Sequence, residues 1–260
     1  MILAALDSGA SKAGMVVIRV TTSPAGTRFT CLRHGHMELE CDGGAREEAA
    51  VTALLALADW ALQLRAAGER VVFAVEGVEG FVYAGRSATH LFDTADQAGL
   101  IRGVIRAWAR LRGVTWVDPR DVRKTTAKKC RRFVFGTQGD SFGDNEVVLA
   151  VQACVADMPP MPVPVPSQGA KAYAAMHSYD AALVALAVGA ELLGWPAFRL
   201  PDAALAEIAK YRIGAERTKA EKKVLAAAGV KTPRAPRVQS RGTKRRRSES
   251  ARAAARRRAS

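Results

Sequence analysis

Short apolar runs, each followed by a polar residue, organise the first third of the chain. Residues 2–6 form a continuous apolar run that ends at Asp7, as expected for a strand buried on both faces. Residues 15–20 form a second, β-branched run, and Gly9 and Gly14 between the two runs favour a tight turn. The pattern predicts a hairpin with a carboxylate at the end of its first strand. Such a carboxylate either caps backbone amides in the turn or is the first ligand of a metal or phosphate site.

The next elements place a second carboxylate in a similar position. Residues 26–40 keep β character and predict a third strand, antiparallel to the second. Residues 45–67 carry apolar side chains at helical spacing and are followed by Gly68, a frequent residue at helix C-termini. Residues 70–75, apolar from Val71 onward, then predict a short buried strand that ends in Glu76. Because ligands bind where parallel strands end, a carboxylate in this position favours a functional site.

The middle of the chain alternates helical and basic segments. Apolar residues at helical spacing predict a helix over residues 94–112, and residues 114–117 predict another short strand. Seven cations follow within residues 120–132 and belong either to a solvated face or, beside a metal site, to a phosphate-binding rim. Residues 144–158 predict a helix with Asp144 as a possible N-cap. Five prolines in residues 159–166 exclude helix and predict an extended, stiff spacer.

The C-terminal third combines an apolar helix with a basic tail. Residues 177–193 are rich in Ala and predict a helix packed closely against the sheet. His177 and Asp180 lie three positions apart, on one face of its first turn, and such a pair opening an apolar helix favours ligand roles. Residues 201–211 and 215–228 predict two more helices. Residues 230–260 contain twelve Lys and Arg, one Glu and almost nothing to bury, which predicts a disordered tail.

Charge and composition narrow the classes of function. The net charge of +14 over 260 residues is concentrated in the basic tail, so a polyanion such as nucleic acid is the expected partner. No apolar run reaches the roughly 18 residues of a membrane span, and the N-terminus lacks the basic region of a signal peptide. Four widely spaced cysteines predict reduced thiols in a cytoplasmic protein. Cys31, His34, His36 and Cys41 match no standard zinc spacing and are expected to be ordinary strand residues.

The motifs and their order resemble the ribonuclease H-like fold and, within it, the RuvC family of Holliday-junction resolvases. Leu6-Asp7-Ser8-Gly9 is similar to the family's opening strand with its first catalytic Asp, and Ala74-Val75-Glu76 to its second-carboxylate strand. Residues 97–104 resemble the helix that follows, and residues 118–124 resemble the basic stretch after the next strand. The His177-Ser-Tyr-Asp180 sequence resembles the final catalytic motif, in which the family has Asp or His three residues before the last Asp.

The resemblance spans residues 1–193 and implies an α/β fold with a mixed five-stranded sheet flanked by helices. The implied organisation is a nuclease domain over residues 1–194, a helical extension over 195–229 and a disordered basic tail over 230–260. The proline segment, the late helices and the tail depart from the family pattern. They are more typical of a phage or otherwise divergent member.

The resemblance also implies a metal-dependent, structure-selective endonuclease that cuts four-way junctions or other branched DNA. Two Mg²⁺ or Mn²⁺ ions would hydrolyse the phosphodiester, and carboxylate oxygens are the ligands these ions prefer. In this interpretation Asp7 bridges both ions, Glu76 holds one and Asp180 the other. His177 ligates the second ion or positions the attacking water.

Further side chains are expected to bind the DNA. Phe81 or Tyr83, just after Glu76, could stack on an unpaired base. Phosphate contacts are expected from Arg120, Arg123, Lys124, Lys128, Lys129, Arg131, Arg132, Lys244, Arg245, Arg246 and Arg247. Residues 244–247 also fit a nuclear import signal, although a DNA-binding arm explains them without one. The two-fold symmetry of a four-way junction predicts a homodimer, with the helix over residues 94–112 at the interface.

Three other classes of protein remain alternatives. One is a different ribonuclease H-like nuclease that cuts flaps, other branches or packaging intermediates. The second is an actin-like or sugar-kinase ATPase, which also opens with a strand, an Asp and a Gly-rich turn but normally needs two such domains. The third is a non-catalytic DNA-binding protein. Selective cutting, ATP-dependent phosphoryl transfer, and binding without cutting distinguish these classes.

Overall fold

A computed structural model describes residues 1–8, 12–38, 45–76, 103–111, 113–114, 121–136, 139–165, 170–196 and 198–227. The chain divides into two units, Met1–Lys210 and Tyr211–Ser260. The first unit continues past residue 194 because Phe198, Leu200, Ala204 and Ile208 are buried in its core. The predicted tail over residues 230–260 lies outside the described residues.

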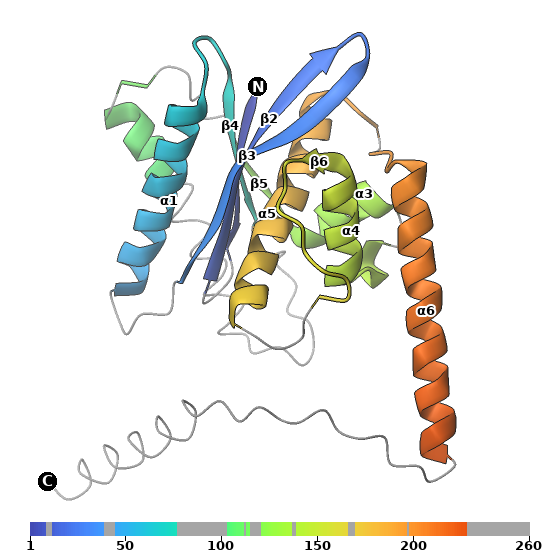
Figure 1. Ribbon diagram of the computed structural model, residues 1–260. Coiled ribbons are helices and arrows are strands. Elements are labelled where there is room, and N and C mark those ends of the chain that lie inside the picture. Colours follow the sequence, from blue (N-terminus) through green and yellow to red (C-terminus); the bar gives the residue numbers. More distant parts are fainter. Residues whose placement is uncertain are drawn as a thin grey trace, which may run out of the picture. The chain divides into compact units, whose positions relative to one another are not determined.

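Six strands form one mixed sheet in the order β5-β4-β1-β2-β3-β6 (Figure 1). Its strands are β1 (Ile2–Ser8), β2 (Lys12–Ser23), β3 (Gly26–Glu38), β4 (Val71–Glu76), β5 (Val122–Thr125) and β6 (Val155–Ala156). The first three are antiparallel neighbours, whereas β4 is parallel to β1 and β5 is parallel to β4. This arrangement confirms the predicted ribonuclease H-like fold. The predicted number of five strands is wrong because β6 adds a short parallel pairing beside β3.

Helices cover both faces of the sheet. They are α1 (Ala45–Leu64), α3 (Ala127–Phe135), α4 (Asp144–Cys154), α5 (Ala170–Leu192) and α6 (Asp202–Ala227), with a short 3-10 turn, η2 (Gly139–Ser141). Residues 103–111 are also helical. Figure 1 shows α1 on one side of the sheet and α3, α4 and α5 on the other.

Alternation along β1 decides which face carries Asp7. Ile2, Ala4 and Leu6 pack in the core on the α1 side, whereas Leu3 and Ala5 pack in the core on the α5 side. Successive side chains of a strand point to opposite faces, so Asp7 continues the second set. The carboxylate of Asp7 therefore lies on the face that α5 covers.

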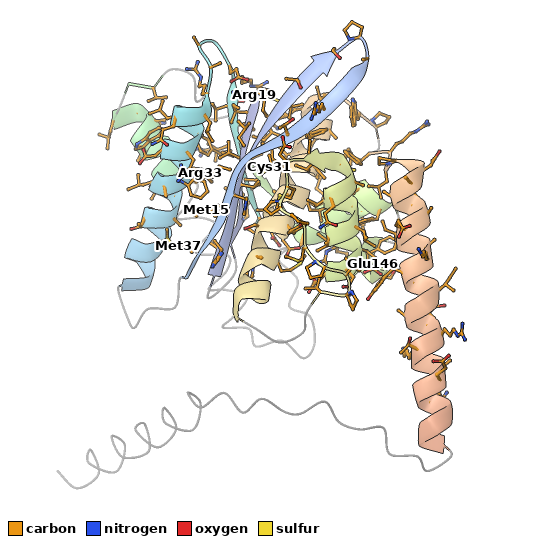
Figure 2. All side chains as sticks on the ribbon, viewed as in Figure 1. Met15, Arg19, Cys31, Arg33, Met37 and Glu146 are labelled. Carbon is orange, nitrogen blue, oxygen red and sulfur yellow. The ribbon has the colours of Figure 1, made fainter. Side chains whose placement is uncertain are left out.

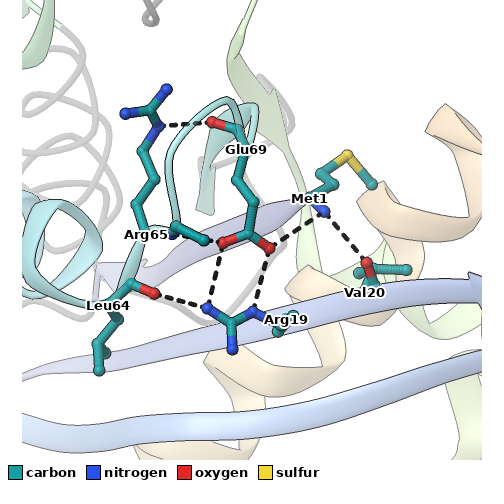
Figure 3. Close-up of polar contacts among 7 residues, drawn as sticks. Met1, Arg19, Val20, Leu64, Arg65 and Glu69 are labelled. Carbon is teal, nitrogen blue, oxygen red and sulfur yellow. Dashed lines mark hydrogen bonds and ion pairs between the residues drawn. The ribbon is translucent and has the colours of Figure 1, made fainter.

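The register between β1 and β4 is fixed at the end of the sheet away from Asp7. Arg19 Nε and Nη2 each donate to Glu69 at 3.1 Å, and Nη2 also donates to the carbonyl oxygen of Leu64 at 2.7 Å (Figure 3). The Met1 ammonium lies 3.7 Å from Glu69 Oε1 and donates to the carbonyl oxygen of Val20 at 3.1 Å. These bonds tie the turn after α1 to β1 and β2, and so align β4 with β1.

β3 carries Cys31, His34 and His36, which are predicted to be ordinary strand residues, and its side chains divide between the two faces of the sheet. Arg33 stacks over Trp60 of α1 at 4.2 Å, and Met37 also packs on that side (Figure 2). Cys31 is a free thiol buried in the opposite core, while His34 and His36 are exposed. Cys130 and Cys154 are also free thiols, as predicted, and Cys41 lies outside the described residues.

The prediction of a strand over residues 114–117 is wrong at Val114, which follows a turn and belongs to no strand. Residues 115–117 lie outside the described residues. The next strand is β5, inside the predicted basic run. Val122 and Thr125 of β5 are buried while the two residues between them are exposed. Asp121, directly before β5, is buried and paired with Arg70, which fixes the start of the strand.

Three helix boundaries also differ from prediction. α5 begins at Ala170 because Ala-rich residues precede His177, so His177 and Asp180 lie within the helix and not in its first turn. α4 ends at Cys154 and is capped by Gly143, whose N–H donates to Glu146 Oε2 at 3.0 Å. Glu146 is labelled on α4 in Figure 2. The two predicted late helices are one helix, α6.

The proline segment packs on the fold, which corrects its prediction as a spacer. The N–H of Val165 donates to Asn145 Oδ1 at 2.6 Å, and Gln152 Nε2 donates to the carbonyl oxygen of Met161 at 3.0 Å. The hydroxyl of Tyr179 on α5 donates to the carbonyl oxygen of Pro159. These bonds join the segment to α4 and α5.

The helix predicted over residues 94–112 is described only from residue 103 to residue 111. Ile105 and Ala109 are buried in the core on the α1 side, as the apolar pattern predicts. Leu111, which the same pattern places on the buried face, is instead 87% exposed. In the described part of the chain, no helix is long and apolar enough to span a membrane.

Candidate active site

Asp7 and Glu76 meet at the ends of two parallel strands. Leu6 pairs with Val75, so the next residues, Asp7 and Glu76, lie side by side. Their carboxyl groups are hydrogen-bonded to each other, and the N–H of Ala127 donates to Glu76. Ala127 opens α3 directly after β5, so the start of α3 also faces this pair. The sequence prediction that these two strand ends form one site is consistent with this placement.

α5 brings His177 and Asp180 to the same place. His177 Nδ1 lies 2.6 Å from Asp7 Oδ2, a hydrogen bond that the carboxylate accepts when Nδ1 carries the proton. One ligand atom each from Asp7, His177 and Asp180 lie within 4.8 Å of one another. Asp180 also raises the pKa of Asp7 through charge repulsion, as Glu76 does for Asp180. Thus the four predicted residues form one cluster from β1, β4 and α5.

Gly14 allows α5 to approach the sheet this closely. A Cβ atom at this position would lie 1.9 Å from the carbonyl oxygen of His177 and 2.7 Å from the backbone nitrogen of Ser178. Such distances leave no room for any side chain. The Ser178 hydroxyl donates to the carbonyl oxygen of Gly35 at 2.7 Å, which holds the same turn of α5 against β3.

Burial makes the carboxylates of this cluster resist ionisation. Desolvation raises the pKa of Asp7 from 3.8 to about 7, and Asp180 adds to the shift by charge repulsion. Desolvation, with repulsion from Glu76, likewise raises the pKa of Asp180 to about 7. Burial, followed by the charge and the hydrogen bond of Asp7, raises the pKa of Glu76 well above its usual value. A divalent cation would relieve the repulsion among these groups.

The raised pKa values predict that the ion-free protein loses stability as pH rises. Asp7 and Asp180 bind protons up to about pH 7 when folded but only to about 3.8 when unfolded, so the folded state holds more protons between these values. We expect the free energy of unfolding in a chelator to fall by on the order of 1–3 kcal/mol between pH 5 and pH 8. Urea unfolding at the two pH values measures this, and Asp180→Asn should reduce the slope. Equal stability at both pH values would contradict the raised pKa values.

The donor set fits Mg²⁺ or Mn²⁺. Carboxylate oxygens are their preferred protein ligands, and an imidazole nitrogen is acceptable to Mn²⁺. Asp7 is central because it contacts both Glu76 and His177 and lies within ligand distance of Asp180. The residues that would hold the ions are therefore Asp7, Glu76, Asp180 and His177.

Comparisons with known proteins bear on the fold. A scan against protein-family models finds no match, and no curated protein matches the sequence. Among solved structures, Thermus thermophilus RuvC matches with 19% identity and a TM-score of 0.48, covering 75% of this chain and 97% of that chain. In fold, the chain is similar to RuvC. RuvC from the same organism in complex with a Holliday junction substrate gives 18% identity and a TM-score of 0.47, covering 75% and 98%.

A third solved structure belongs to a different protein. The Aquifex aeolicus PPX-GPPA enzyme matches with 12% identity and a TM-score of 0.32, covering 58% of this chain and 40% of that chain.

The predicted DNA-binding cations of residues 120–132 divide into two groups. Arg123 and Lys124 on β5 and Lys129 and Arg132 on α3 are exposed, and Lys128 is half-buried. Arg131 is half-buried and turns toward the acidic cluster, where its Nη2 lies 3.8 Å from Asp180 Oδ1, and its phosphate contact stays a prediction. Phe81, Tyr83, Arg120, Lys244, Arg245, Arg246 and Arg247 lie outside the described residues.

Two features of the site were missed by sequence reasoning. The first is the pairing of Arg131 with Asp180 and with Asp144, at 3.8 and 3.9 Å, for which a run of cations gives no signal. The second is the close approach of α5 to Gly14. A glycine beside a strand's β-branched run is a known sign of close backbone approach, so this signal was present in the sequence.

Proposed function

We propose that the chain is a divalent-metal-dependent endonuclease that cuts four-way junctions or other branched DNA, as the RuvC family does. The single observation that carries the proposal is the convergence of Asp7, Glu76, His177 and Asp180 in one partly buried cluster. A structural role explains this cluster poorly, because its three carboxylates repel one another and the charge of Arg131 does not offset their burial.

Each residue of the cluster has a separate role in the proposal. When bound, two divalent ions supply a reactive water and stabilise the charge on the leaving oxygen. Asp7 lies between the other ligands and would be shared by both ions, with Glu76 on one side and Asp180 on the other. His177 holds a proton at Nδ1 against Asp7, or ligates the second ion through its ring. Its position is fixed because α5 packs on Gly14.

The exposed cations beside the cluster would hold the DNA backbone. β5 and α3 follow directly after one another in the chain and carry Arg123, Lys124, Lys128, Lys129 and Arg132. β5 adjoins β4, which ends at Glu76, and Ala127 at the start of α3 donates to Glu76, so the two elements that carry these cations border the cluster. Phosphate contacts of this kind position DNA without reading its sequence. We assign Phe81 or Tyr83 to base stacking and the basic residues Arg120 and 244–247 to further backbone contacts.

A homodimer would allow paired cuts in the two symmetric strands of a junction. The helix predicted over residues 94–112 remains our choice for the interface. Leu111 supports this choice because it is 87% exposed at the end of the described part of that helix.

Substrate selection tests the proposed function. A labelled four-way junction, a flap and a linear duplex would each be incubated with the protein in Mg²⁺ or Mn²⁺ at moderate salt. We expect symmetric nicks in the junction, little cutting of the duplex, and no cutting in a chelator. Equal cutting of all three substrates would indicate a general branch or packaging nuclease. Tight, salt-sensitive binding without cutting would indicate a DNA-binding protein without nuclease activity.

A further inference from the structure

Arg131 differs from the other cations of α3 in where its charge lies. Its side chain is 25% exposed, whereas that of Lys129 on the same helix is 60% exposed and pairs with Glu191. Arg131 Nη2 lies 3.8 Å from Asp180 Oδ1 and 3.9 Å from Asp144 Oδ1. Asp180 is one of the residues expected to hold an ion. The positive charge of Arg131 therefore lies next to Asp180, a carboxylate that is expected to bind a metal ion.

The surroundings of Arg131 hold its guanidinium in this position. Nη1 donates to the carbonyl oxygen of Phe142 at 3.0 Å. Gly139 packs against the backbone of Arg131, where an added Cβ atom would lie 2.5 Å from its carbonyl oxygen. Nε is buried and has no hydrogen-bond partner among the described residues. The guanidinium is thus held on one edge, while Nε retains an unused donor.

The charge of Arg131 acts on the whole cluster. It lowers the pKa of Asp7, Glu76 and Asp180, although burial outweighs it at each of them. Arg131 is a monovalent substitute for part of the charge that a divalent ion would bring. An ion that approaches Asp180 meets both the repulsion of this cation and its competition for the carboxylate.

We propose that Arg131 competes with the second divalent ion for Asp180 and so makes loading of that ion depend on bound DNA. This inference rests on the proposed function. An incoming phosphate can accept from the guanidinium, which forms bidentate bonds to phosphate, and Asp180 is then released to bind an ion. Arg131 is therefore a positioning residue that acts through Asp180. It would keep the site incompletely loaded until a substrate phosphate arrives.

Binding of Mn²⁺ to the DNA-free protein, measured by calorimetry, tests this. Arg131→Gln should bind Mn²⁺ more tightly than the wild type, by on the order of tenfold, because the competing charge is removed. Adding an uncleavable junction should raise the Mn²⁺ affinity of Arg131→Gln by a smaller factor than it raises that of the wild type. Lys210→Gln removes an exposed charge on α6, outside the proposed DNA-binding residues, and should leave Mn²⁺ affinity within about twofold of the wild type. Thermal unfolding of each variant checks that it is folded.

Arg131→Lys separates charge from shape. It keeps the positive charge without the planar fork, so its Mn²⁺ affinity in the absence of DNA should stay near that of the wild type. Unchanged or weaker Mn²⁺ binding by folded Arg131→Gln would overturn the inference alone. Absence of Mn²⁺ binding at the cluster in the wild type, tested against Asp7→Asn, would instead overturn the proposed function.

Discussion

Replacing Asp7 with Asn should abolish DNA cutting while leaving junction binding nearly intact. Asp7 contacts Glu76 and His177, and its carboxylate lies within 4.8 Å of a ligand atom of Asp180. No other residue of the cluster can therefore replace its carboxylate. Metal ions in such sites stabilise transition-state charge by several kcal/mol, so we expect cutting to slow by about a thousandfold or more. Junction affinity, measured by fluorescence anisotropy in Ca²⁺, should change by less than about threefold because phosphate contacts come from other residues.

Asp59→Asn is the matched control for this change. Asp59 is an exposed carboxylate on α1, on the opposite face of the sheet from Asp7. The Asp59→Asn variant also replaces a carboxylate with an amide, so it controls for the change in the protein's net charge. Its cutting rate should stay close to that of the wild type. Cutting by Asp7→Asn at a rate near that of the wild type would contradict the assignment of the cluster as the active site.

Replacing Gly14 with Ala should destabilise the fold and remove cutting together. The added Cβ would lie 1.9 Å from the carbonyl oxygen of His177, so α5 must move away from β2 and take His177 and Asp180 with it. We expect the free energy of unfolding to fall by about 3 kcal/mol or more, as for overpacked positions that cannot relax. Urea unfolding measures the loss, and a junction-cleavage assay on the remaining folded protein measures the change at the site.

Gly103→Ala provides the control for the glycine substitution. Gly103 opens the described part of a helix, and no atom of the described residues beyond that helix's own backbone lies within 4 Å of an added Cβ. This change should alter the free energy of unfolding by less than about 1 kcal/mol, in the stabilising direction, because Ala favours helix. A Gly14→Ala protein as stable and active as Gly103→Ala would show that α5 does not pack on β2 as described.

The positions of Asp7 and Glu76 at strand ends could be predicted from the sequence because they depend only on the apolar pattern of the residues before them. A continuous apolar run defines each strand, and the first polar residue after it marks the strand end. His177 and Asp180 were found as a pair for the same reason, since spacing of three on a helix is a local property. The start of α5 was missed because residues 170–176 are also good helix formers, and pattern alone does not show where such a helix begins.

Elements whose form depends on tertiary contacts were not predictable in the same way. β5 has two exposed cations between two buried residues, a spacing that matches no strand period and indicates a basic loop. The predicted break between residues 211 and 215 contains Gly214, but a single glycine costs only about 1 kcal/mol and the neighbouring residues keep α6 continuous. Arg131 is one of several cations in its run, and only the position of α3 against α5 turns it toward Asp180.

Anomalous scattering from Mn²⁺ locates ions at the acidic cluster without relying on activity. Crystals of the protein would be grown with Mn²⁺ and an uncleavable four-way junction, and data would be collected near the manganese edge. We expect two anomalous peaks at the cluster, with Asp7 as a ligand shared by both and Asp180 as a ligand of one. Peaks only at other acidic residues, with none beside Asp7, would contradict the assignment of this cluster as the metal site.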